Sequence, residues 1–201
     1  MQLSPLSPER IPDAAYLLRR AFDADPMFRF LLPSERARRA WLRLVMASAL
    51  EECATRGEIW AAHLDALAGT IALIPPGGHH ASPASRVGRL LRILATTPAA
   101  PPPLRFVVNG PRVLGVIADR HPREPHLYVQ VLGADPSFRG RGVGAALVEK
   151  ALARAAESGV FAYLETTNPK NLGFYHRFGF EVVEEINPSP GGGPPIWTLR
   201  T

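Results

Sequence analysis

A loop of alternating arginine and glycine holds the residues of this chain best suited to bind an anion: Arg139-Gly140-Arg141-Gly142-Val143-Gly144. A run of strand-forming residues, His126 to Leu132, precedes it, and an uninterrupted helical pattern, Ala145 to Glu157, follows it. A glycine turn between a strand and a helix start gathers backbone N–H groups, and the helix dipole favours negative charge there. The last two glycines allow close approach and unusual φ values, and both arginines add positive charge. The pattern predicts a site for a phosphorylated cofactor.

Glycine spacing alone fits neither of two common nucleotide motifs. The dinucleotide fingerprint has the spacing G-x-G-x-x-G inside a βαβ unit, whereas this loop has G-x-G-x-G and no such unit before it. The triphosphate loop ends in Lys-Ser or Lys-Thr, whereas Gly144 is followed by Ala145 and Ala146. A glycine turn without a binding role is the alternative that the rest of the chain has to exclude.

A second motif lies downstream: Asn168-Pro-Lys-Asn171-Leu-Gly-Phe-Tyr175-His-Arg-Phe-Gly179-Phe180. In order and separation, the two motifs resemble the signatures Q/R-x-x-G-x-G/A and N-x-x-x-x-x-F/L-Y-x-x-x-G-F of the GCN5-related N-acetyltransferase (GNAT) superfamily. The resemblance is strong over residues 127–180, moderate over the first 75 residues and poor over residues 76–125. It implies an α/β (α+β) GNAT fold, with a central mixed, mostly antiparallel sheet of about six to seven strands flanked by helices.

The resemblance also implies acetyl-CoA as the acyl donor, with its pyrophosphate on the N–H groups of the loop. The end of the preceding strand would run beside the pantetheine arm and splay from its neighbour, through backbone groups of Val131, Leu132, Gly133 and Ala134. The N–H of Leu132 would polarise the thioester carbonyl. Gly133 fits either a bulge or a plain turn. Asn168 and Asn171 would contact the polar arm of the cofactor, although many relatives carry alanine where Asn171 stands.

Acetyl transfer to an amine also requires protonation of the departing thiolate. The resemblance places Tyr175 near the cofactor sulfur, where a phenol with a pKa of about 10 can act as general acid. The alternative role for Tyr175 is packing against Phe174 and Phe178, because aromatic side chains usually pack.

The sequence offers three candidates for the general base that deprotonates the amine. Many relatives use a glutamate in the strand before the loop, but this strand offers Tyr128 and Gln130. Glu165, at the end of the next expected strand, is one candidate. His126 is another, because imidazole titrates near neutral pH. A chain of water molecules is the third.

The composition fits one globular domain over residues 1–201, with 46% hydrophobic residues and a net charge of +5. Arginines are spread along the chain without a basic stripe, so we expect no nucleic-acid partner. No apolar run reaches the roughly 20 residues of a membrane span. The N-terminus lacks the pattern of a signal peptide, and the single cysteine, Cys53, suits a reducing compartment. We therefore expect a cytoplasmic protein without a membrane partner, and the abundant Ala, Arg and Pro suggest a GC-rich bacterial genome.

Hydrophobic periodicity predicts the order of the elements. Helices are expected from Ser7, near 27–32, after the cap Ser34, and over 140–158 and 171–177; strands are expected over 2–6, 57–64, 68–75, 127–132, 160–165, 180–186 and 196–199. Residues 76–125 hold nine prolines and seven arginines against two acidic residues. They predict a partly ordered lid or substrate-selecting insertion, with a basic helix over 86–94 and an extended segment over 98–103.

These observations predict direct transfer of an acetyl group from acetyl-CoA to a primary amine of a small molecule or peptide. No metal is expected, since the pair His79-His80 has no further ligands at metal-binding spacing. The alternative is a non-catalytic acyl-CoA-binding or regulatory module on the same fold. A monomer and a homodimer are both compatible with the sequence. Acidic candidates on the acceptor side are Asp23, Asp25 and Glu35.

Overall fold

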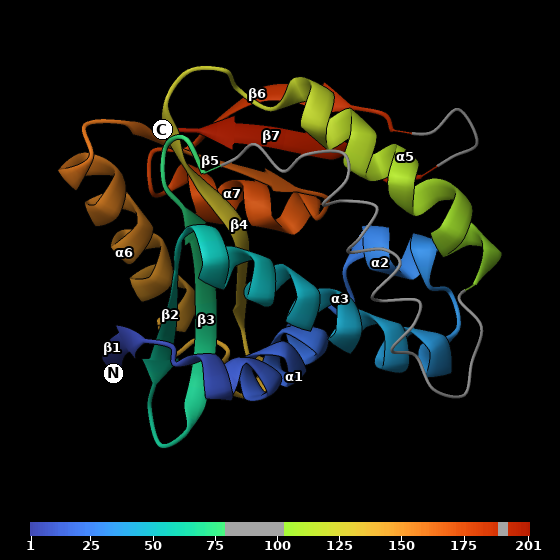
Figure 1. Ribbon diagram of the computed structural model, residues 1–201, viewed down its shortest axis with the longest axis horizontal. Coiled ribbons are helices and arrows are strands. Elements are labelled where there is room, and N and C mark those ends of the chain that lie inside the picture. Colours follow the sequence, from blue (N-terminus) through green and yellow to red (C-terminus); the bar gives the residue numbers. More distant parts are fainter. Residues whose placement is uncertain (79–102, 189–192) are drawn as a thin grey trace.

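One mixed sheet organises the protein. The computed structural model describes residues 1–78, 103–188 and 193–201, and these contain seven strands in the order β1-β2-β3-β4-β5-β7-β6 (Figure 1). The strands are β1 (Gln2–Pro5), β2 (Glu58–His63), β3 (Leu67–Ile74), β4 (His126–Ala134), β5 (Phe161–Thr166), β6 (Glu181–Ile186) and β7 (Ile196–Arg200). All neighbours are antiparallel except β4 and β5, which are parallel. The predicted mixed, mostly antiparallel sheet is confirmed.

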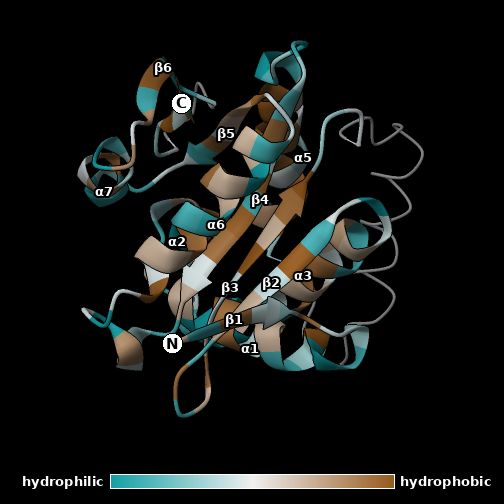
Figure 2. Ribbon diagram, turned by 90° about the vertical axis from the view of Figure 1, so that its left-hand side faces the viewer, coloured by the Kyte–Doolittle hydropathy of each residue, from teal (hydrophilic) through white to brown (hydrophobic). Residues whose placement is uncertain are grey.

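Six helices in the described residues cover the two faces of this sheet. They are α1 (Ile11–Ala21), α2 (Pro26–Leu31), α3 (Glu35–Arg56), α5 (Leu104–Arg120), α6 (Val143–Glu157) and α7 (Leu172–His176). The buried side chains of α1, α2, α3 and α5 form one hydrophobic cluster, and those of α6 and α7 form the other. Figure 2 shows α6 and α7 on one side of the apolar strands and α3 on the other. The fold is therefore a sheet between two layers of helices.

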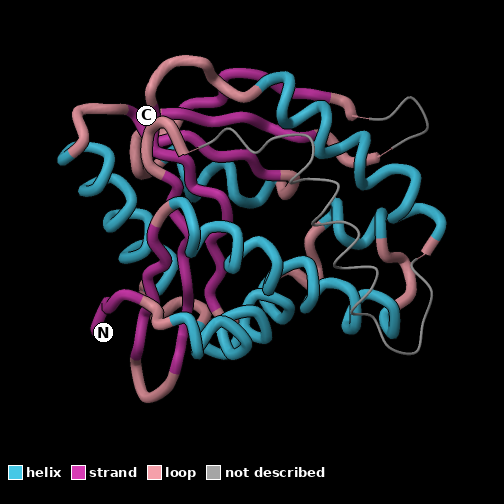
Figure 3. Tube along the Cα trace, viewed as in Figure 1, coloured by secondary structure: helices cyan, strands magenta, loops and turns pink. Residues whose placement is uncertain are grey.

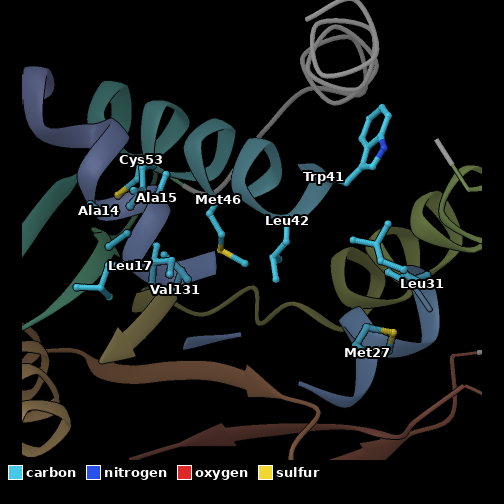
Figure 4. Close-up of a cluster of buried hydrophobic side chains, with 14 of the residues drawn as sticks. Ala14, Ala15, Leu17, Met27, Leu31, Trp41, Leu42, Met46, Cys53 and Val131 are labelled. Carbon is cyan, nitrogen blue, oxygen red and sulfur yellow. The ribbon is translucent and has the colours of Figure 1, made fainter. Parts of the chain in front are cut away.

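The cluster beneath α3 packs this helix against α1 and the sheet (Figure 4). Its α3 side chains Trp41, Leu42 and Cys53 are fully buried. Ala14 and Ala15 of α1 are also fully buried, and their small side chains let the two helices approach closely. Cys53 is therefore a packing residue. The predicted cap of α3 is confirmed too, because the Ser34 hydroxyl accepts the N–H of Ala37 at 3.5 Å.

The other layer is built on α6, which confirms the helix expected over residues 140–158. Val143, Leu147, Ala151 and Ala155 are all buried against the sheet. The helix sits close to β3 because Gly69 has no side chain: a Cβ there would lie 2.6 Å from Cγ1 of Val143. This contact sets the position of the N-terminal turn of α6 over the sheet.

Residues 104–120 lie inside the segment expected to be a partly ordered insertion, but they form the regular helix α5. Phe106 and Val113 of α5 are buried in the larger cluster, and the Phe106 ring lies 5.8 Å from that of Trp41. At the other end of α5, Arg120 pairs with Glu184 of β6. Thus α5 extends from α3 to the far edge of the sheet (Figure 1). The expected helix over 86–94 and residues 98–102 lie outside the described part of the chain.

In the part of the chain that the structure describes, no helix combines the length and the apolar character needed to cross a membrane.

Candidate functional site

β4 and β5 part from each other midway along their length. Their parallel pairing joins residues 126–128 to residues 161–163, whereas β4 continues to Ala134 and β5 to Thr166. Beyond this point β4 stays paired with β3 and β5 with β7. Figure 3 shows that strands β1–β4 and β5–β7 run in clearly different directions. The predicted splay is confirmed, and it leaves two facing main-chain edges that can bond to an extended ligand.

A β-bulge in β4 marks the start of this splay. Ala72 of β3 faces Val131, and its neighbour Leu73 faces Val129, so Gln130 is an extra residue in β4. A bulge of this kind bends its strand and increases the local twist. Because Gln130 comes shortly after the last β4 residue paired with β5, the bulge directs the rest of β4 away from β5.

Gly133, where a bulge or a turn was expected, has neither. It pairs in register with Thr70 inside the strand. Its role is steric, because a Cβ at this position would lie 2.6 Å from Cδ2 of Leu18 and 3.1 Å from Cβ of Ala21. The glycine lets α1 pack directly on β4 at the edge of the splay.

The arginine–glycine loop follows β4 and ends at the start of α6. Gly140 and Gly142 have φ values of 79° and 78°, in the left-handed region that favours glycine. Gly142 is the N-cap of α6, and the N–H groups of the first helical turn have no partner within a helix. Gly144 lies in the helix instead, and a Cβ there would be 3.4 Å from Cζ of Phe174. The unusual φ expected for both glycines is thus confirmed at Gly142 only. Gly144 has a different role, because its lack of a side chain makes room for the ring of Phe174.

The charges around this loop are arranged to leave it positive. Arg139 and Arg141 are exposed, and Arg141 lies 3.6 Å from Asp65 and over the ring of Phe138. Asp135 fixes the start of the loop by accepting the N–H of Ser137 at 2.9 Å. Its carboxylate is neutralised by Arg20 of α1 at 3.1 Å. The loop therefore offers unpaired N–H groups and two arginines to an anion.

Tyr175 lies on α7 among aromatic rings. The ring centroids of Phe174 and Phe180 are 5.2 Å and 5.6 Å from that of Tyr175. Burial raises the pKa of Tyr175 to about 12, so its phenol keeps its proton at neutral pH. The packing role is confirmed for Phe174, while Phe178 packs on Phe174 instead. The role as general acid stays a prediction.

Asn168 and Asn171 build the turn that leads from β5 to α7. Oδ1 of Asn168 accepts the N–H of Lys170 at 3.1 Å, and Nδ2 of Asn171 donates to Oγ1 of Thr166 at 3.1 Å. Thr166 also accepts the backbone N–H of Asn168. Both asparagines therefore have local structural contacts, and their predicted contact with a cofactor is untested.

Of the two candidate bases, Glu165 lies on the stretch of β5 that has left β4. Its Oε1 atom is buried and has no hydrogen-bond partner among the described residues. The Oε1 atom of Gln130, in the bulge of the opposite strand, is buried without a partner in the same way. Unpaired buried oxygens are costly, so each of these two is expected to have a donor beyond the described contacts.

His126, the other candidate, is fully buried at the start of β4. Its Nδ1 atom lies 2.8 Å from the carbonyl oxygen of Glu124, and Nε2 lies 3.0 Å from Nε2 of His121. Burial lowers the pKa of His126. His121 in turn has its Nδ1 atom 3.7 Å from Oε1 of Glu165. The structure thus joins both candidate bases through His121, a residue that no local pattern of the sequence singled out.

The acidic residues expected on the acceptor side all have structural partners. Asp23 pairs with Arg38 at 3.2 Å, and Glu35 pairs with its neighbour on the same face of α3, Arg39. Asp25 caps α2, accepts the hydroxyl of Thr167, and has its pKa raised by burial. In the described residues, no three His, Cys, Asp or Glu side chains are grouped to hold a metal ion, and His79 and His80 lie outside those residues.

A mixed sheet that opens between its parallel strands, beside an arginine–glycine loop at a helix N-terminus, defines a GNAT-like fold. The sequence model described as "Acetyltransferase (GNAT) family" matches residues 92–180. The fold is also that of a crystal structure titled histone acetyltransferase HPA2 and related acetyltransferase, from Corynebacterium glutamicum. That chain is 25% identical, with a TM-score of 0.71 over 99% of this chain and 94% of its own. The matched segment and the fold are therefore similar to those of the GNAT acetyltransferase family.

Two curated relatives match the part that holds the motifs. Mycothiol acetyltransferase of Propionibacterium freudenreichii is 43% identical over 70 residues, which are 33% of this chain and 22% of that protein. Acetyltransferase Atu2258 of Agrobacterium fabrum is 33% identical over 78 residues, which are 38% of this chain and 57% of that protein. The match therefore spans less than two thirds of either relative. The C-terminal condensation domain of Ebony, at 12% identity and a TM-score of 0.63, shares the fold alone.

Proposed function

We propose that this protein is an N-acetyltransferase that moves an acetyl group from acetyl-CoA to a primary amine of a small molecule or peptide by direct attack. One observation supports the proposal most directly. The edge of β4 that is not paired with β5 leads directly into the arginine–glycine loop. A ligand with its phosphates on the loop can extend its arm along that edge. Coenzyme A has this form, with a pyrophosphate at one end and an amide-bearing arm.

The residues present fit this donor. The N–H groups at the start of α6, with Arg139 and Arg141, would hold the pyrophosphate. Residues 131–134 of β4 would bond to the arm, and the N–H of Leu132 would polarise the thioester carbonyl. Gly142 keeps the mouth of the loop free of side chains, since a Cβ there would meet nothing within 4 Å. Asn168 and Asn171 would flank the arm from the turn after β5.

The proposed chemistry divides between the two faces of the sheet. Tyr175, held in the α6–α7 layer, would protonate the departing thiolate, and its raised pKa keeps the necessary proton on it. On the other strand of the splay, the unpaired oxygen of Glu165 would accept an N–H of the acceptor. Gln130 presents a second such oxygen. Acceptor oxygens without donors favour an amine, which brings N–H groups, over an acidic acceptor. The proposal requires no metal, and it holds for a monomer or a homodimer.

Release of the CoA thiol, measured with a panel of primary amines, tests the proposal. Tyr175→Phe should lower kcat by about 10²- to 10⁴-fold, the usual contribution of a general acid, without a matching change in KM for acetyl-CoA. Tyr16→Phe is the matched control, because Tyr16 is 50% exposed on α1. The protein's own thiol should not interfere, since burial raises the pKa of Cys53 to about 12.

The same experiment separates the alternative. If CoA raises the melting temperature but no amine supports thiol release, the protein is a non-catalytic CoA-binding module. If millimolar CoA produces no thermal shift, neither function holds.

A further inference from the structure

The corner between α1 and α2, residues 22–28, crosses the opening between β4 and β5. At one end Phe22 lies over β4, since a Cβ on Gly133 would be 3.4 Å from Cε2 of the Phe22 ring. Three residues later the corner reaches the other strand, where the hydroxyl of Thr167 lies 3.1 Å from both carboxylate oxygens of Asp25. Thr167 directly follows the last residue of β5. The corner therefore bridges the two strands at the place where they have parted.

Asp25 fixes the shape of this corner. Its Oδ1 atom accepts the N–H groups of Met27 and Phe28 at 3.0 Å and 3.2 Å, which caps α2. Because the same carboxylate accepts the Thr167 hydroxyl, one side chain holds both the start of α2 and the end of β5. Burial raises the pKa of Asp25, as expected for a carboxyl group with little access to water. Asp25 is therefore a positioning residue for the corner.

Two phenylalanine rings of the corner lie on the face of the sheet that α1 and α3 cover. Phe22 and Phe28 are both partly buried and pack edge to face, with ring centroids 5.8 Å apart and an interplanar angle of 85°. They pack against the same hydrophobic cluster as Val131, which is buried on β4 two residues before Gly133. The wall that the corner presents beside the opening is therefore apolar.

The acidic side chains of the corner are engaged by the protein itself. Asp23 pairs with Arg38 of α3 at 3.2 Å, and Asp25 accepts the two N–H groups of its cap and the hydroxyl from β5. Arg29, the next charged residue, is exposed and its Nε atom lies 3.5 Å from the carbonyl oxygen of Asp23. A second ammonium group on the acceptor would lose hydration at this wall and would have to compete for carboxylates that already have donors. The charges therefore disfavour an acceptor with a second cation.

We propose that Phe22 and Phe28, held across the opening by Asp25, recognise the acceptor, and that this acceptor is a primary amine carried on an aromatic or other apolar group, an inference that rests on the proposed function. The apolar group packs on the two rings, while its amine reaches the opening between β4 and β5. Burial of such a group favours binding by about 10- to 150-fold over a polar arm.

Rates of CoA thiol release with three amines test this substrate class. 2-Phenylethylamine carries an aromatic arm, 1,4-diaminobutane carries a second ammonium group, and ethanolamine carries a short polar arm. We expect kcat/KM for 2-phenylethylamine to exceed that for each of the others by at least about tenfold. A smaller ratio in either comparison would overturn the inference.

Phe28→Ala tests whether the wall is the selecting element. It should lower the preference for 2-phenylethylamine over ethanolamine by about tenfold, through a higher KM for the aromatic amine and with KM for acetyl-CoA unchanged. Because both amines are measured on one preparation, this ratio is insensitive to any loss of folded protein. Tyr16→Ala removes a ring that is 50% exposed on α1, and it should leave the ratio at the wild-type value. An unchanged ratio in Phe28→Ala would reject the wall as the site of recognition.

Variants at the contact between Asp25 and Thr167 separate positioning from direct binding. Thr167→Val loses the hydroxyl at nearly constant shape and should raise KM for 2-phenylethylamine by about 2- to 10-fold, whereas Thr167→Ser keeps the hydroxyl and should restore it. Asp25→Asn keeps an N-cap oxygen but loses the charge, so it should affect 2-phenylethylamine and 1,4-diaminobutane alike. A selective loss of diamine turnover in Asp25→Asn would show that Asp25 binds a second ammonium group, which would contradict the proposal.

The two hypotheses fail separately. If CoA raises the melting temperature but none of the amines is acetylated, the proposed function is wrong. If the amines are acetylated without the expected preference, the proposed function stands and the inference about the acceptor is wrong.

Discussion

Two glycines at opposite ends of α6 allow the proposed anion-binding role of the loop to be separated from backbone strain. Gly142 precedes the helix with φ 78°, and Gly159 follows it with φ 64°. A Cβ on either would meet nothing within 4 Å, so alanine adds strain but no clash. Holding a non-glycine residue in the left-handed region costs about 1–2 kcal/mol. Gly142→Ala and Gly159→Ala should therefore lower stability equally, by a melting-temperature shift of about 2–8 °C for a domain of this size.

The two variants should differ in their affinity for coenzyme A. Gly142→Ala relieves its strain by rotating the loop, which turns N–H groups at the start of α6 away from the pyrophosphate. One lost hydrogen bond to a charged group costs about 1.5–3 kcal/mol. That corresponds to about a 10- to 150-fold increase in Kd. Gly159 lies at the far end of the helix, so Gly159→Ala should leave Kd unchanged.

Calorimetric titration with CoA, alongside thermal unfolding, measures both quantities. Pantetheine serves as a second ligand, since it lacks the pyrophosphate and should bind both variants alike. If the variants lose equal stability and bind CoA equally well, the loop does not hold the pyrophosphate. A loss of pantetheine affinity in Gly142→Ala would instead show that the strain spreads along β4.

Two further predictions concern packing and pH. Gly133→Ala should destabilise the protein by about 1–3 kcal/mol in urea unfolding, because its Cβ meets Leu18 at 2.6 Å. In a Leu18→Ala background the same change should cost less than about 1 kcal/mol, and equal costs in both backgrounds would show that Leu18 is not the obstacle. Because burial lowers the pKa of His126, the unfolded chain binds more protons than the folded chain below a pH of about 6.5. The free energy of unfolding therefore decreases as the pH is lowered, by at most about 1.4 kcal/mol per pH unit. His126→Gln removes this contribution, so its stability should depend less on pH between about 7 and 5 than that of the wild type; parallel curves would contradict the buried neutral state.

Those parts of the fold that depend on local physical chemistry were predictable from the sequence. The cap at Ser34 and the apolar face of α6 follow from spacing alone, and both are found. The two strands that flank Asp65 and Ala66 are found as β2 and β3. The arginine–glycine loop was predictable for the same reason, since helix starts and glycine turns are encoded within a few residues.

Features that depend on distant segments were not predictable. α5 was missed because Pro111 and the surrounding prolines argue locally against a helix, while its stability comes from burying Phe106 against Trp41. The bulge lies at Gln130 and not at Gly133, because register is set by pairing with β3. Glu165 and His126 were both candidates, but only the folded chain shows that they share a neighbour. His121 reaches them because α5 ends beside the last pairs of β4 and β5.

The arrangement of the two layers supports the splay as the place of the proposed transfer. Tyr175 belongs to the α6–α7 layer, whereas His121 and Glu165 lie on the face that α5 approaches. A closed sheet would separate Tyr175 on one face from Glu165 on the other. Between β4 and β5 the sheet stops being continuous just beyond Tyr128 and Tyr163. In the proposed reaction, an acyl group held at this opening would be accessible from both faces, so the amine could arrive from one side while the thiolate is protonated from the other.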